Sequence, residues 1–170
     1  MATLAGQTRT RAKPLAADGY ERFLAVAATA LLATILVALG KGLTHGGQLP
    51  LVIWGHVLTV LVALALTPVM LLRPRGDRPH RLLGRVWVAA MFLTALVSFF
   101  VQTSNPGHFS FVHLISAYVI VAAPLLWWSA RTHRIALHRR HVRGMVTGAL
   151  LIAGFFTFPF GRLLGRWLFA

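Results

Sequence analysis

Two of the eight histidines in this 170-residue chain lie inside strongly apolar stretches, where an ionisable side chain is unusual. His56 lies near the start of the stretch 51–72, and His113 lies near the start of the stretch 111–130. Because an ionisable group in such a setting is energetically unfavourable, it is by default a functional candidate. The simpler alternative is an imidazole that only hydrogen-bonds to a backbone carbonyl or to a serine of a neighbouring helix.

Two further histidines open a short motif that occurs twice. His80 begins "HRLLGR" and His138 begins "HRRHVR", and both motifs read His-Arg, three residues, Arg. Each motif follows one of the two apolar-segment histidines at a similar distance. The segments 51–102 and 111–161 therefore read as one helical hairpin used twice in the same direction. A coincidence of spacing is the alternative.

The chemistry open to these histidines is limited by what the sequence lacks. There is no cysteine, and no Asp or Glu lies in any expected apolar span, which disfavours a proton pump or a cation transporter. A structural zinc site would need about four converging ligands, and each helical pair supplies two. A haem iron needs two axial ligands on opposite faces of a flat ring, and facing helices of a bundle can supply two histidines.

The repeat pairs the four histidines across a bundle. His56 would face His113 from the second and fourth spans, and His80 would face His138 from the third and fifth. These four are the predicted ligands of haem iron, with one or two molecules of haem b as the predicted cofactor. The predicted cationic anchors for the haem propionates are the motif arginines Arg81, Arg85, Arg139 and Arg143. One haem on the first pair alone, or none, stays open, because His-Arg clusters at helix ends commonly contact lipid phosphate.

The elements that must position these residues are transmembrane helices. The chain is 57% hydrophobic and 12% charged, with a mean hydropathy of +0.72, and an apolar helix of about 20 residues crosses a bilayer. We expect an all-α, multi-pass bundle in which spans two to five form a four-helix core and span one packs at the periphery. A basic N-terminal arm, 1–22, precedes a transmembrane domain, 23–170, with spans near 23–43, 51–72, 82–102, 111–130 and 143–161.

The positive charge is distributed unevenly along the chain. Fourteen of the seventeen basic residues lie before the first span, or between the second and third and between the fourth and fifth spans including the first residues of spans three and five. With five spans these zones fall on one side, and the positive-inside rule makes that side cytoplasmic. We therefore expect a cytoplasmic N-terminus and an external C-terminus. Anionic lipids on the cytoplasmic face are sufficient partners for this charge, and no nucleic-acid partner is expected.

The histidine pairing resembles the cytochrome b561-type dihaem fold, an architectural likeness that covers about 51–161. The blocks "RPHRLLGR" and "HRRHVR", with His56 before them, resemble a bacterial predicted membrane protein family, the domain-of-unknown-function family numbered 2306. That resemblance implies a multi-pass protein of the bacterial inner membrane without an established activity. His141 departs from the family pattern, which tends to an aromatic residue at this position, and it is an alternative to His138 as a ligand.

We therefore expect a b561-like membrane cytochrome, a transmembrane electron-transfer protein that exchanges electrons with a quinone or a redox protein partner. Two six-coordinate irons would leave no open coordination site, which favours electron transfer over oxygen activation. One rival is a non-catalytic accessory or assembly subunit of a larger membrane complex. Another is a small transporter for an anionic solute, with the cytoplasmic arginines as its funnel.

Overall fold

The computed structural model describes residues 16–44, 49–101 and 111–169, and within these ranges the chain is all-helical, without a strand. Its elements are α1 (Gly19–Thr44), α2 (Leu51–Leu72), α3 (Arg78–Ser98), α4 (Phe111–Arg131), α5 (Ile135–Gly144), the π-helix η1 (Met145–Ile152), α6 (Ala153–Phe155) and α7 (Leu163–Phe169). The expectation of an all-α protein is confirmed.

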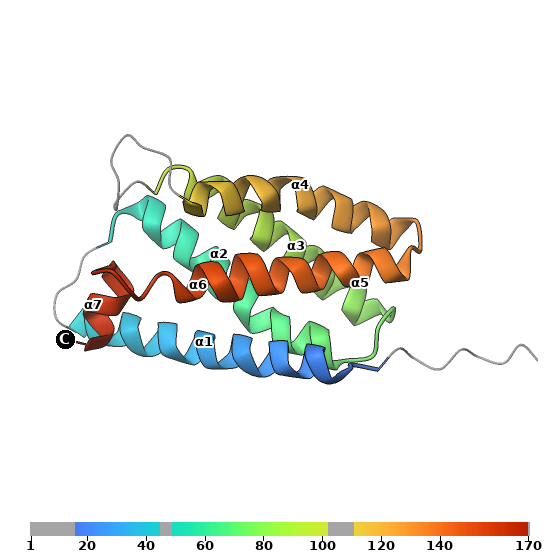
Figure 1. Ribbon diagram of the computed structural model, residues 1–170, viewed down its shortest axis with the longest axis horizontal. Helices are drawn as coiled ribbons and strands as arrows, with labels where there is room; N and C mark the ends of the chain where they lie inside the picture. The colour runs from blue at the N-terminus through green and yellow to red at the C-terminus, as the bar shows by residue number, and fades with distance from the viewer. Residues whose placement is uncertain (1–15, 45–48, 102–110, 170) are drawn as a thin grey trace, which may run out of the picture.

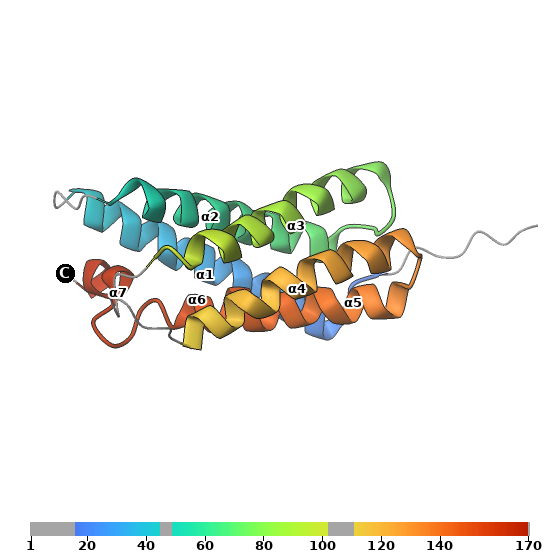
Figure 2. The same ribbon diagram turned by 90° about the horizontal axis from the view of Figure 1, so that it is seen from above.

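The long helices form an up-and-down bundle (Figures 1 and 2). Each helix packs against the next along the chain, and α5, η1 and α6 follow one another as a single helical rod. The rod closes the bundle, because η1 packs against α1, α4 and α2. The start of α1, the α2–α3 connection and the α4–α5 turn lie at one end of the bundle, which we call the arginine-rich end (Figure 1). At the other end, the α7 end, the short helix α7 packs against α1.

Four helices, α1 to α4, are long and apolar enough to cross a membrane. The fifth predicted span corresponds to the rod, which begins at Ile135 instead of 143 and changes from α- to π-helix at Met145. Its three segments are each shorter than a membrane-spanning helix, so a fifth span remains a prediction. The predicted third span is also displaced, because α3 begins at Arg78 and ends at Ser98.

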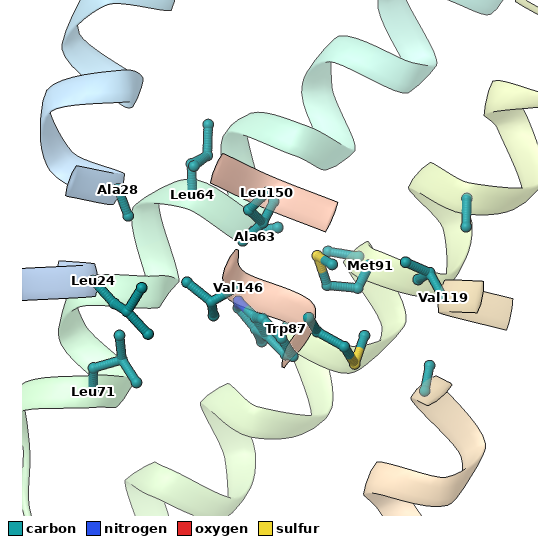
Figure 3. Close-up of a cluster of buried hydrophobic side chains, with 14 of the residues drawn as sticks. Leu24, Ala28, Ala63, Leu64, Leu71, Trp87, Met91, Val119, Val146 and Leu150 are labelled. Atoms are coloured by element: carbon teal, nitrogen blue, oxygen red, sulfur yellow. The ribbon is translucent and has the colours of Figure 1, made fainter. Parts of the chain in front are cut away.

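Helix α1 belongs to the core, which corrects the expectation that span one packs at the periphery. Leu24, Ala25 and Ala28 of α1 are almost fully buried in the same cluster as Leu64, Trp87 and Val146. Figure 3 shows Leu24, Ala28, Leu64, Trp87 and Val146 converging from α1, α2, α3 and η1. The two alanines allow α1 to approach its neighbours closely, as small residues do between membrane helices.

Side-chain caps determine where two helices begin. Asp18 and Glu21 form a reciprocal capping box, in which each side chain accepts a hydrogen bond from the other residue's backbone N–H, at 3.0 and 3.2 Å. Residues 19–22, assigned from the sequence to the N-terminal arm, therefore belong to α1. Asp77 caps α3 by accepting from the backbone N–H of His80 at 2.7 Å.

Candidate functional site

The first predicted histidine pair lines one cavity. His56 lies in the second turn of α2 and His113 in the first turn of α4, and both contribute to the wall of a cavity of about 240 Å3 near the α7 end. The two side chains that the sequence paired across the bundle thus share one internal space.

A backbone hydrogen bond orients the His56 ring. Nδ1 of His56 lies 3.2 Å from the carbonyl oxygen of Thr94 on α3. Because a carbonyl can only accept, this bond requires the proton on Nδ1, and in the neutral ring the lone pair is then on Nε2. Histidines that bind metals almost always donate their other N–H in this way. The same bond is also what the simpler alternative, a hydrogen-bonded core histidine, expects.

Packing and polar contacts position the remaining groups around the cavity. The ring of His113 packs at a tilt against Phe99, with centroids 5.6 Å apart. The Thr94 hydroxyl donates to Oγ1 of Thr59 at 2.7 Å, which holds α3 against α2 beside His56. Ser98 and Ser116 hydrogen-bond to each other and join α3 to α4.

The remainder of the cavity wall is mainly apolar. Parts of it come from η1 and from the chain at the start of α7. Ala149 and Leu150 of the π-helix η1 form part of it, and π-helical segments are frequent at functional sites. Arg162 and the first residues of α7 form another part. The sequence marked Arg162 only as one of the few basic residues outside the cytoplasmic zones, and its place at this cavity was missed.

The second predicted pair lies at the arginine-rich end. His80 is in the first turn of α3, His138 is in the first turn of α5, and their charged forms interact electrostatically. Nδ1 of His138 lies 3.5 Å from the carbonyl of Leu126, at the limit of a hydrogen bond. Nδ1 of His80 is buried and has no hydrogen-bond partner among the described residues. His141, the alternative ligand, is an electrostatic neighbour of His138.

The predicted propionate anchors have other partners or remain at the surface. Arg139 and Arg143 form ion pairs with Glu21 and Asp18. Arg81 is exposed and donates from Nη1 to the carbonyl of Gly76 at 3.0 Å. Arg85 is exposed on α3. The structure thus places two of these four arginines against carboxylates of the same chain.

Glu21 is the residue that the sequence reasoning missed most clearly. Its side chain is 1% exposed and pairs with Arg75, Arg139 and Arg143. We expected no carboxylate within a span, but α1 begins at Gly19, so Glu21 lies inside a helix that is able to cross a membrane. The available signal was "DGYE" at 18–21, the capping-box pattern before an apolar run.

Within the described ranges, no group of three or more His, Cys, Asp or Glu side chains could hold a metal ion by itself. A haem needs fewer protein ligands, and two imidazoles, a mainly apolar wall and an arginine line the cavity at the α7 end. The donor set there fits a bis-histidine haem.

Comparison of the chain with protein-family models, with curated proteins and with solved structures gave no match. The resemblances to a b561-type core and to the predicted membrane protein family stay predictions.

Proposed function

We propose that this protein is an integral membrane b-type cytochrome-like protein that carries electrons through one haem held between His56 and His113. The observation that carries the proposal is that both imidazoles line the same cavity. The hydrogen bond from Nδ1 of His56 to the Thr94 carbonyl supports it, because in the neutral ring it leaves the lone pair on Nε2 for a metal. The haem would supply the reversible one-electron chemistry.

The protein's own residues would bind and shield this group. His56 and His113 would hold the iron of this group, and Arg162 lies in the wall of the same cavity. The apolar wall would exclude water. The cavity, about 240 Å3, is smaller than the roughly 300–1,000 Å3 of most ligand pockets, so we expect lining side chains to move apart on binding.

The proposed setting is the bacterial inner membrane, with the arginine-rich end in the cytoplasm and the rod as a fifth span. Arg134 stacks over Trp128 with its guanidinium carbon 4.5 Å from the ring centroid, and Arg131 lies 5.6 Å over Trp127. Tryptophan and arginine side chains are typical of membrane interfaces, so these pairs support a boundary at the end of α4. Anionic lipids, and a quinone or a redox protein, would be the partners.

The optical spectrum of purified protein tests the proposal. The full chain is produced with ample haem precursor, purified in detergent and examined by reduced-minus-oxidised absorption and by haem extraction. We expect the sharp bands of a six-coordinate b-type haem at about one haem per chain. A colourless protein would contradict the proposal and leave the accessory or assembly subunit as the better interpretation.

A further inference from the structure

Three buried nitrogen atoms at the arginine-rich end lack a hydrogen-bond partner among the described residues. They are Nε of Arg73, Nη1 of Arg75 and Nδ1 of His80. Both arginines belong to the α2–α3 connection, and His80 lies in the first turn of α3, so one short segment supplies all three. Buried polar atoms without a partner are rare in folded proteins and indicate a bound ion or water.

Two of the three residues lie around one carboxylate. Nη2 of Arg73 and the backbone N–H of His80 donate to the two oxygens of the Asp77 carboxylate, at 3.1 and 2.7 Å, and Arg75 lies two residues from Arg73 in the same connection. Arginine nitrogens can only donate hydrogen bonds. Arg73 and Arg75 therefore each keep an unused donor near the start of α3.

The side-chain carboxylates of the chain already bind other donors in this region. The sequence holds three acids, Asp18, Glu21 and Asp77. Asp77 accepts from Nη2 of Arg73 at 3.1 Å and from the backbone N–H of His80. Glu21 binds Arg75 and Arg139, and Asp18 binds Arg139 at 2.9 Å. An anion that satisfies the remaining donors must therefore come from outside the chain.

We propose that the arginine-rich end binds a phosphate group, held by Nε of Arg73, Nη1 of Arg75 and Nδ1 of His80. A phosphate group presents several strong acceptor oxygens around one centre, which matches donors that come from three side chains. This role for His80 differs from the axial ligation predicted from the sequence. It does not depend on the cavity at the α7 end, so it stands whether or not that cavity holds haem.

The test uses a variant that keeps charge but removes one donor. Arg73→Lys retains the positive charge beside Asp77 and lacks Nε–H. Arg140→Lys is the matched control, because Arg140 is an exposed arginine of α5 whose side chain has no hydrogen bond or ion pair to the described residues. His80→Phe, which keeps a flat ring without a donor, is a second variant should Arg73→Lys fail to fold.

Two arms separate the sources of phosphate. In the first, inorganic phosphate is titrated calorimetrically into full-length protein in an uncharged detergent, at an ionic strength held constant with chloride. In the second, native mass spectrometry counts the phosphatidylglycerol that the protein retains from phosphatidylcholine nanodiscs containing this lipid. Binding in the first arm identifies a free anion, and retention in the second alone identifies a lipid headgroup.

In the arm that shows binding, we expect Arg73→Lys and His80→Phe to weaken it roughly tenfold, as loss of a charge-assisted hydrogen bond does. Arg140→Lys should bind like the wild type. No saturable binding in either arm would overturn the proposal. An equal loss in Arg140→Lys would also overturn it, because it would show attraction by surface charge alone.

Discussion

Glu21, at the start of α1, and Arg139, on α5, form a two-point ion pair across 118 residues of sequence. Nε and Nη2 of the arginine lie 2.6 and 2.9 Å from the two carboxylate oxygens. Arg75 and Arg143 contact the same carboxylate. One buried acid thus links α1 to the rod and to the α2–α3 connection. These contacts hold the bundle together at its arginine-rich end.

Replacing this acid should destabilise the fold. Glu21→Gln would leave three arginines around a neutral amide, and removing one partner of a buried ion pair costs about 3–5 kcal/mol. The arginines are 16–28% exposed, so we expect a smaller loss, about 2–3 kcal/mol. Unfolding by SDS in mixed micelles measures it. Asp18→Asn, at the exposed end of the same cluster, should lose less, and an equal loss would show that Glu21 has no special role.

The contact between α1 and α7 should control access to the cavity. A Cβ atom at Gly42 would overlap the indole ring of Trp167, so Gly42→Ala should displace α7. Gly40→Ala is the matched control, since nothing lies within 4 Å of a Cβ there. The chain has no cysteine, so a single Leu164→Cys reports access through its rate of reaction with a water-soluble maleimide. We expect faster labelling with Gly42→Ala only, and equal rates would refute a closing role for α7.

Acid should weaken the start of α3. The backbone N–H of His80, and then the Arg73 guanidinium, hold the pKa of Asp77 below its ordinary value of 3.8. A carboxyl whose pKa is lower in the folded state contributes stability above its unfolded pKa and loses it as the pH falls through the folded value. As the pH is lowered beyond about 3.8, the unfolding midpoint of the wild-type protein should therefore decrease more steeply than that of Asp77→Asn. Parallel curves would contradict this assignment.

The orientation can be tested without purifying the protein. Reporter fusions after residues 76, 135 and 170 should read inside, inside and outside, because the arginine-rich end should stay in the cytoplasm. An external signal at 76 would reverse the proposed topology. A cytoplasmic signal at 170, with the others unchanged, would show that the rod from α5 to α6 does not cross the membrane.

The sequence predicted the helices better than it predicted their contacts. Apolar length located α1 to α4. His56 and His113, which the repeat paired, line one cavity, and their pairing as ligands stays a prediction. The ion pairs of Glu21 could not be predicted, because hydropathy gives no information on which arginine contacts an acid far away in the sequence. Hydropathy likewise treats α- and π-helix alike, so the change of helix type at Met145 could not be predicted.

Haem stoichiometry in histidine variants tests the central proposal most directly. Wild type, His56→Ala, His113→Ala, the double variant and His133→Ala are purified in parallel, and haem per chain is measured after extraction. His133, exposed in the α4–α5 turn, is the matched control. We predict about one haem per chain in the wild type and in His133→Ala. Each cavity variant should lose this haem, and the double variant should be no worse, because the two ligands act as a unit. A wild-type haem content in His56→Ala or in His113→Ala would contradict bis-histidine ligation.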